Sequence, residues 1–296
     1  MNEDYELTLF DRIEVIKTTN EKYDLEHNAY VSFSGGKDST VLHYLIDLAL
    51  PNNKIPRVYI DTGIEYNAIK EFVMSLKEKD DRFQIIKPTQ PIKKILETYG
   101  YPFKNKEHSL RVNLYQHNCK NKTLDKYMGT GDFSCPQKLK YQFSKDFTIP
   151  ISHKCCYKLK KEPAKKWREA NHRPITITGM QQSEGGERAN VKCILLDKNN
   201  NIVSFHPLAV VDEKFENEFI KQNNITLCKL YYPPFNFKRT GCKGCPYNLK
   251  LQQDLATMEL YMPNERKQCE IIWKPIYDEY RRINYRLKRV EEMKLF

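Results

Sequence analysis

The chain has 296 residues, of which 40% are hydrophobic and 29% are charged, a composition that fits a globular protein and excludes a disordered one. No apolar run approaches the roughly 20 residues that cross a bilayer, and the first residues are acidic where a signal peptide is basic, so we expect a cytoplasmic protein without membrane contact. Forty-nine Lys and Arg against 38 Asp and Glu leave a net charge of +11, which favours phosphate-bearing partners without separating nucleotides from nucleic acids.

The predicted elements alternate between helix and strand. Apolar side chains at helical spacing predict the helices, and short β-rich runs that end in polar loops predict the strands. Strands that alternate with helices imply right-handed crossovers, so we predict an α/β fold with a doubly wound, mainly parallel sheet. The expected helices cover 6–27, 41–50 and 67–78, and the expected strands cover 29–33, 57–60, 83–86 and 174–178.

The remaining segments lack this alternation. Residues 103–150 carry mixed charge and several aromatic side chains without a clear period, so we expect an insertion or a lid there. Residues 251–296 look helical and end in a basic cluster, which predicts a helical C-terminal extension. We therefore divide the chain into an N-terminal helix at 1–27, an α/β domain at 28–250 that contains the insertion, and the helical tail.

A glycine loop joins the first predicted strand to its helix. Two glycines let the backbone turn tightly beside an anion, and the amides of the following helix point at that anion. A lysine adds positive charge, three hydroxyls can donate to phosphate oxygens, and the aspartate helps to hold either the loop or a magnesium ion. The loop is not a Walker sequence, because G-x-x-x-x-G-K-[ST] is absent. The predicted phosphate site consists of Ser34, Gly35, Gly36, Lys37, Asp38, Ser39 and Thr40.

Nine cysteines include two pairs with ligand-like spacing. Cys155 and Cys156 are adjacent, and Cys242 and Cys245 form a C-x-x-C motif. In a reducing compartment such spacing favours metal or cluster ligation over disulfides. Four thiolates suit either a zinc ion or an iron–sulfur cluster. The other five lack such spacing and are expected to be buried small hydrophobes, with an alternative role as redox thiols kept open for Cys119 and Cys135.

The loop sequence S-G-G-K-D-S resembles that of the adenine nucleotide alpha-hydrolase, or PP-loop, superfamily. Asp61, Thr62 and Gly63, which follow the second predicted strand, resemble the D-T-G segment of the phosphoadenosine phosphosulfate (PAPS) reductase family within it. The resemblance implies that the protein binds ATP or an adenylyl nucleotide and that these three residues border the nucleotide pocket.

A second stretch, from Gly179 to Arg188, resembles a family segment that follows a sheet strand and contacts the substrate's phosphates or sulfate. The resemblance implies that Gly179 lies in the nucleotide site and that Arg188 clamps an anion. Gln181 stands where the family has its first arginine, and it supplies no charge. The sulfate-end contact is therefore weakened relative to the family.

The two cysteine pairs, followed by Glu-Pro and Pro respectively, resemble the 4Fe-4S ligand set of the cluster-containing sulfonucleotide reductases. This resemblance implies that all four thiols hold one cluster and that Lys160 is the basic residue close to it. Together the resemblances span residues 28–250. The implied ligands are Cys155, Cys156, Cys242 and Cys245.

The reductases of this family carry a nucleophilic cysteine in a C-terminal E-C-G-x-H motif, which is absent here. Cys269 is the one cysteine after the cluster pair, and neither Gly nor His is beside it. We therefore expect an enzyme that activates a nucleotide and handles sulfur, with Lys37, Asp38 and Arg188 as its catalytic residues. A nucleic acid or a sulfur-donor protein stays open as its partner. The alternatives are a genuine PAPS or adenylyl sulfate reductase and a non-catalytic nucleotide and cluster sensor.

Overall fold

The protein folds into two compact units. The structure is a computed structural model that describes residues 3–288. Within this range unit 1 holds residues 3–61, 67–87 and 163–240, and unit 2 holds residues 62–66, 88–162 and 241–288. None of the helices in the described range is both long and apolar enough to span a bilayer.

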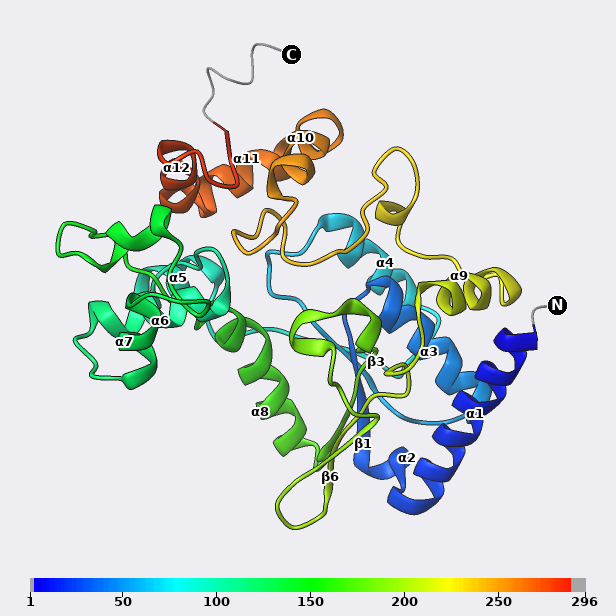
Figure 1. Ribbon diagram of the computed structural model, residues 1–296. Helices are drawn as coiled ribbons and strands as arrows, with labels where there is room; N and C mark the ends of the chain where they lie inside the picture. Colours follow the sequence, from blue (N-terminus) through cyan, green and yellow to red (C-terminus); the bar gives the residue numbers. More distant parts are fainter. Residues whose placement is uncertain (1–2, 289–296) are drawn as a thin grey trace. The chain divides into compact units, whose positions relative to one another are not determined.

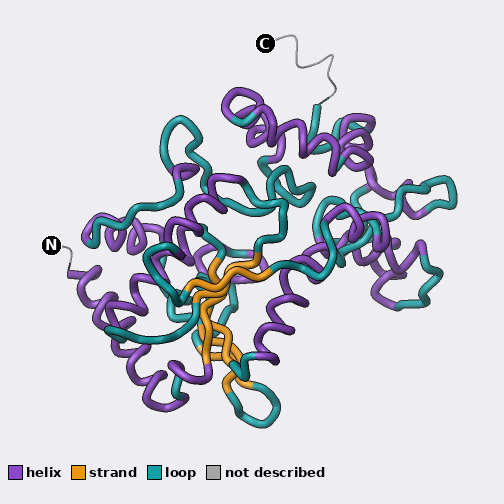
Figure 2. Tube along the Cα trace, turned by 180° about the vertical axis from the view of Figure 1, so that it is seen from behind, coloured by secondary structure: helices purple, strands orange, loops and turns teal. Residues whose placement is uncertain are grey.

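Unit 1 is built on a six-stranded sheet with the order β3-β2-β1-β4-β6-β5 (Figure 1; strands in orange in Figure 2). All neighbours are parallel except the edge strand β5, which runs antiparallel to β6. The predicted α/β class with a mainly parallel sheet is confirmed. The strands are β1 (Ala29–Phe33), β2 (Arg57–Ile60), β3 (Phe83–Ile86), β4 (Ile175–Ile177), β5 (Ile194–Leu196) and β6 (Ile202–Phe205).

The helices of unit 1 include one pair that replaces a single predicted helix. The segment expected as one helix at 6–27 breaks at Asp24, whose backbone is left-handed with φ 49°. Its predicted apolar face is only partly buried, because Ile16 is enclosed whereas Leu7 and Phe10 are exposed. The helices are α1 (Glu3–Tyr23), α2 (Leu25–Asn28), α3 (Lys37–Ala49), α4 (Asn67–Lys77), α8 (Glu162–Ala170) and α9 (Glu213–Gln222).

Helices cover both faces of the sheet, as a doubly wound fold requires. Alternate residues of a strand point to opposite faces, and Val31 of β1 is buried in the core that also contains α3 residues such as Leu45. Tyr30 points the other way, where its ring lies 5.0 Å from that of Trp167 in α8. The Trp167 indole donates a hydrogen bond of 3.0 Å to Gln84 of β3, which anchors α8 on this second face.

Unit 2 is helical in the described residues, apart from isolated bridges. The segment 103–150, expected to be an insertion, has a polar core in which His108 lies between the Tyr127 hydroxyl at 2.9 Å and the Gln142 amide oxygen at 2.7 Å. The segment expected as a helical tail contains the last three helices. The elements are α5 (Ile92–Tyr99), α6 (Lys106–Gln116), α7 (Lys122–Met128), a 3₁₀-helix (Gln137–Phe143), a π-helix (Tyr157–Lys161), α10 (Leu251–Tyr261), α11 (Pro263–Ile272) and α12 (Lys274–Arg282).

Candidate functional site

The glycine loop lies between β1 and α3, at the carboxyl end of a central strand. Gly35 has φ +73°, and a Cβ there would lie 2.8 Å from Cγ2 of Ile69, so the position excludes other residues. Gly36 is the N-cap of α3, and no side chain caps this helix end. The first turn of α3 therefore presents a partial positive charge that no N-cap side chain offsets, and a helix end of this kind can bind phosphate.

The hydroxyls predicted to donate to phosphate also stabilise the loop. Ser39 and Thr40 both donate to the carbonyl of Gly36, at 3.0 and 2.9 Å. The Ser34 and Ser39 hydroxyl oxygens lie 3.0 Å apart. Because Ser39 and Thr40 are buried, their hydroxyls fix the turn of the glycine loop.

Tyr231 and Thr240 contact the loop where α3 begins. The backbone amide of Lys37 donates to the Tyr231 hydroxyl at 2.9 Å, and that hydroxyl lies 2.9 Å from Oγ1 of Thr240. A Cβ on Gly36 would come within 3.2 and 3.3 Å of these two oxygens. A glycine is thus needed here for close approach rather than for its backbone angle.

Lys37 forms ion pairs with two glutamates of α9. Its amino nitrogen lies 3.1 Å from Oε2 of Glu216 and 3.4 Å from Oε1 of Glu213. Burial lowers the pKa of Lys37, but the two carboxylates have the larger combined effect, so the pKa of the lysine is raised. Burial, helped by the charge of Asp38, raises the pKa of Glu216 to about 7, although Lys37 acts against this. Glu216 also accepts a hydrogen bond from the Gln181 side-chain amide.

Asp38 and Arg188, the other predicted catalytic residues, lie in the same neighbourhood. Burial raises the pKa of Asp38, while the positive charges of Lys37, Arg188 and Arg239 lower it. Gly179 packs against this aspartate, since a Cβ on the glycine would lie 2.8 Å from the Asp38 carbonyl oxygen. The described residues of unit 1 therefore gather Lys37, Asp38, Arg188 and Gly179 around one loop.

The D-T-G segment is divided between the two units. Asp61, at the end of β2, is paired with Lys70 at 2.7 Å within unit 1. Thr62 and Gly63 belong to unit 2, where the Glu65 carboxylate accepts hydrogen bonds from the Thr62 amide at 3.0 Å and its hydroxyl at 2.6 Å. A role for these residues in a nucleotide pocket stays a prediction.

The four predicted cluster ligands all belong to unit 2. Cys155 and Cys156 open the helical segment that continues into the π-helix Tyr157–Lys161. Cys242 pairs with Glu65 in an antiparallel bridge, and the amide of Cys245 donates to the Cys242 carbonyl at 3.2 Å. π-helical segments are uncommon in proteins, but those that occur are often found at functional sites.

The thiols share one electrostatic environment. Burial raises the pKa of Cys155, and the charges of Cys242, Cys156 and Cys245 raise it further. Lys160 opposes this effect at Cys242, and the charge of Cys242 in turn raises the pKa of Lys160. The charges of both cysteine pairs and of Lys160 act on Cys155 and on Cys245, so the two pairs approach one another in unit 2.

The other cysteines in the described chain offer no comparable group. Cys269 is fully buried in α11, and burial raises the pKa of its thiol to about 12. Its Sγ would lie 2.7 Å from a Cβ on Gly244, so the glycine makes room for it. Cys119 is exposed and Cys135 is buried, at separate points of the segment 103–150.

A third polar cluster, around α3, is an ionic network rather than a ligand site. His43, Asp47 and Asp80 are the one group of His, Cys, Asp or Glu in the described range with three ligand atoms within 4.8 Å. Two arginines already occupy its carboxylates, since Asp47 lies 2.7 Å from both Arg57 and Arg82. Burial, together with the charge of Arg57, lowers the pKa of His43 to about 4, so the histidine is neutral in this network.

Several functional candidates had no signal in the sequence. Glu216 lies in the ordinary amphipathic helix α9, and no motif marks it as a partner of Lys37. Arg239 precedes the second cysteine pair, but its charge acts on Asp38. These contacts join segments distant in sequence, and neither spacing nor composition predicts them.

The sheet and its glycine loop define a PP-loop nucleotide-binding α/β fold. Residues 28–135 and 132–248 match the sequence profile of the phosphoadenosine phosphosulfate reductase domain. Because the match covers more than half of the chain, the protein belongs to this family. A comparison with curated protein sequences finds no match.

The structure is similar to several solved ones at low sequence identity. PAPS reductase from Candida auris, in a phosphate complex, is 14% identical, with 82% of this chain and 96% of that chain covered and a TM-score of 0.49. Candida glabrata FMN adenylyltransferase is 14% identical, with 78% and 61% covered and a TM-score of 0.45. The NH3-dependent NAD synthetase of Campylobacter jejuni is 13% identical, with 98% and 99% covered and a TM-score of 0.42.

Proposed function

We propose that this protein is an enzyme of the PAPS reductase family that binds ATP or an adenylyl nucleotide at Ser34–Thr40 and carries a 4Fe-4S cluster for nucleotide activation and sulfur transfer. The observation that carries the proposal is the first turn of α3, which has glycine at its N-cap, beside Lys37, with Arg188 and Arg239 acting on Asp38. Helix amides together with cations bind phosphate strongly.

In this proposal the residues of unit 1 have separate tasks. The amides of the loop hold a phosphate, and Lys37 exchanges its glutamate partners for phosphate oxygens. Arg188 neutralises charge at the reacting phosphate or sulfate. Asp38, which is buried among cations, orients these groups or holds a magnesium ion. Gly179 maintains the close packing that fixes Asp38.

We infer an iron–sulfur cluster rather than zinc from the donor set in unit 2. Tetrahedral zinc with bonds of about 2.3 Å needs sulfurs roughly 4 Å apart, but no three of the four cysteine sulfurs form a group within 4.8 Å in the described residues. The four ligands of a cluster bind different iron atoms and need wider spacing. Cys155, Cys156, Cys242 and Cys245 would hold the cluster, which when bound supplies redox chemistry. Lys160 offsets the negative charge of the thiolates.

The reductase alternative is less well supported. Sulfite release from PAPS needs an accessible thiolate that attacks sulfur, whereas Cys269 is fully buried with a pKa of about 12. Gln181, in place of a family arginine, donates to Glu216 and brings no positive charge. We therefore assign the sulfur chemistry to a nucleotide-activating enzyme rather than to a reductase.

Anaerobic purification, followed by iron and sulfide analysis and by titration with ATP, PAPS and adenylyl sulfate, tests both parts of the proposal. Lys37→Ala should weaken binding of the preferred nucleotide by about 1.5–3 kcal/mol, the range for charge-assisted contacts. Lys198→Ala, at an exposed position of unit 1, is the control with the same loss of charge. Equal affinity of the two variants would remove the nucleotide assignment.

A further inference from the structure

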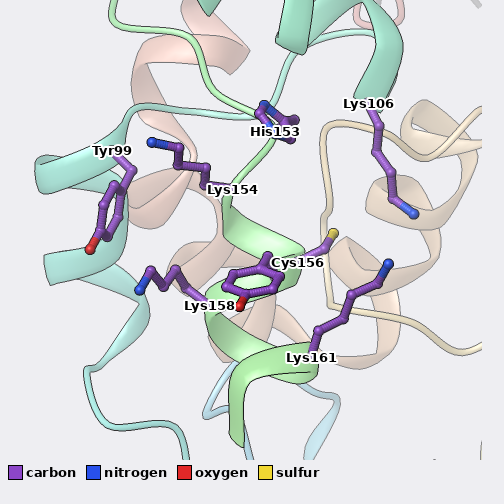
Figure 3. Close-up of a pocket in the computed structure, with 8 residues that line it drawn as sticks. Tyr99, Lys106, His153, Lys154, Cys156, Lys158 and Lys161 are labelled. Atoms are coloured by element: carbon purple, nitrogen blue, oxygen red, sulfur yellow. The ribbon is translucent and has the colours of Figure 1, made fainter. Parts of the chain in front are cut away.

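A cavity of about 470 Å³ in unit 2 is lined, apart from the proposed cluster ligand Cys156, by side chains that the proposed function does not use. It opens around the first cysteine pair, and Cys156 forms part of its wall. Figure 3 shows Lys106 and Lys161 extending from opposite sides toward the region into which the Cys156 sulfur points. The lining consists of Tyr99, Lys106, His153, Lys154, Cys156, Tyr157, Lys158 and Lys161.

The charge of this lysine pocket is positive and largely uncompensated. Its wall contains four lysines and no Asp or Glu. Lys158 is paired with Glu162 at 2.8 Å. No carboxylate in the described chain lies within ion-pair distance of Lys106, Lys154 or Lys161. These three lysines are exposed, so an anion that enters the hollow meets their positive charge without displacing a carboxylate.

Aromatic rings accompany the lysines. Lys154 and Lys158 lie 5.4 and 5.3 Å from the ring centre of Tyr99. Tyr157 lines the pocket with 47% of its surface exposed, so its ring is accessible to a flat ligand. Nδ1 of His153, also in the wall, is buried and lacks a hydrogen-bond partner within the described residues.

We propose that the lysine pocket binds a segment of single-stranded nucleic acid, with backbone phosphates on Lys106, Lys154 and Lys161 and an unpaired base stacked on Tyr157. Positive grooves combined with exposed aromatic rings are the general means by which proteins hold single strands. A free inorganic anion would satisfy the lysines but would not use the ring. A bound strand would lie against Cys156, one of the proposed cluster ligands.

Fluorescence anisotropy of the full-length protein with a labelled 12-nucleotide single strand tests this proposal. With three phosphate contacts, a plot of log K against the logarithm of the salt concentration should have a slope of about −2. Each contact to a single strand contributes about −0.7 to this slope. Lys154→Ala/Lys161→Ala should reduce the slope to about −0.7, whereas Lys154→Arg/Lys161→Arg should keep it. Tyr157→Ala should weaken binding about tenfold, whereas Tyr157→Phe should not.

Two exposed lysines of unit 2 outside the pocket supply the matched control, Lys120→Ala/Lys145→Ala, which removes the same charge. An equal loss in both double variants, or no binding at 50 mM salt, would overturn the proposal. A duplex of the same length should bind more weakly, because its bases are not available for stacking. Displacement of the strand by inorganic sulfate at matched ionic strength would assign the pocket to small anions instead.

This inference goes beyond the proposed function and is tested separately from it. The titration contains no ATP, and Lys37→Ala, which disables the nucleotide loop, should leave strand binding unchanged. Strand binding without nucleotide binding would refute only the proposed function. Nucleotide binding without strand binding would refute only the lysine pocket.

Discussion

The amino group of Lys37 lies 3.1 Å from a carboxylate oxygen of Glu216, so the loop's lysine is held by a buried acid. Since Lys37 has only 14% of its side chain exposed, it is directed by this contact rather than by solvent. A phosphate at the loop must compete with Glu216 for the lysine. The pKa of Glu216, raised by burial to about 7, makes this competition depend on pH near neutrality.

We first predict that nucleotide affinity rises as pH falls through about 7. Protonation of Glu216 removes its negative charge and releases Lys37, so affinity above this pH should fall by up to tenfold for each pH unit. Glu216→Gln mimics the protonated acid and should flatten the profile. Calorimetric titration from pH 5.5 to 8.5 measures it. Protonation of the nucleotide itself affects the wild type and Glu216→Gln equally. Glu213→Gln, which changes an exposed partner of Lys37, is the control.

The second prediction concerns stability at the same residue. The pKa of Glu216 is raised in the folded state from 4.5 to about 7, so its contribution is fully present below about pH 4.5 and is lost as pH rises to about 7. Glu216→Gln should therefore increase the free energy of unfolding at pH 8 by about 1–3 kcal/mol. Urea titrations at pH 5 and pH 8 compare the variant with the wild type. A larger gain at pH 5 would contradict the sign of this linkage.

Much of the fold was accessible from local sequence. The strand β1, the glycine loop and the start of α3 each follow from residues next to one another, because glycine and strand periodicity act locally. The strands β5 and β6 were both missed, and in β5 Leu195 and Leu196 are both exposed and do not alternate. The break between α1 and α2 was missed because Asp24, unlike glycine, gives little warning of a left-handed backbone.

The candidate site was less accessible than the fold. Lys37 and Asp38 were identified from the loop motif, but their partners Glu216 and Arg239 lie 179 and 201 residues further along the chain. The lysine pocket combines Lys106 with Lys161, and only the fold of unit 2 brings them to the same pocket. Tertiary contacts of this kind have no periodicity that a sequence could display.

The third prediction is that Gly179→Ala disturbs the glycine loop by pressing on the backbone of Asp38. The new Cβ would lie 2.8 Å from the carbonyl oxygen of Asp38, and backbone cannot move aside as a flexible side chain can. Overpacking of this kind costs about 1–3 kcal/mol and should also weaken nucleotide binding. Gly129→Ala, whose Cβ would meet ordinary contacts of 3.4 Å, is the control. Thermal unfolding and nucleotide titration of both variants provide the measurement.

The fourth prediction assigns iron to the two cysteine pairs. Anaerobically purified protein should contain about four iron and four sulfide per chain. Cys155→Ser and Cys242→Ser, one from each pair, should each lose most of this iron, because a cluster needs all four thiolates. Cys119→Ser replaces an exposed cysteine and should retain it. Zinc in place of iron, or full iron in either pair variant, would rule out this ligand set.

The last prediction concerns the reaction. We expect that the protein, given PAPS or adenylyl sulfate with thioredoxin under anaerobic conditions, releases little sulfite. A reductase needs a thiolate that reaches sulfur, and binding energy elsewhere cannot replace that covalent step. Cys269 is fully buried with a thiol pKa of about 12, which keeps it protonated at neutral pH. Robust sulfite production that disappears in Cys269→Ser but persists in Cys119→Ser would establish a reductase. It would also require α11 to open, because the Cys269 sulfur is enclosed beside Gly244.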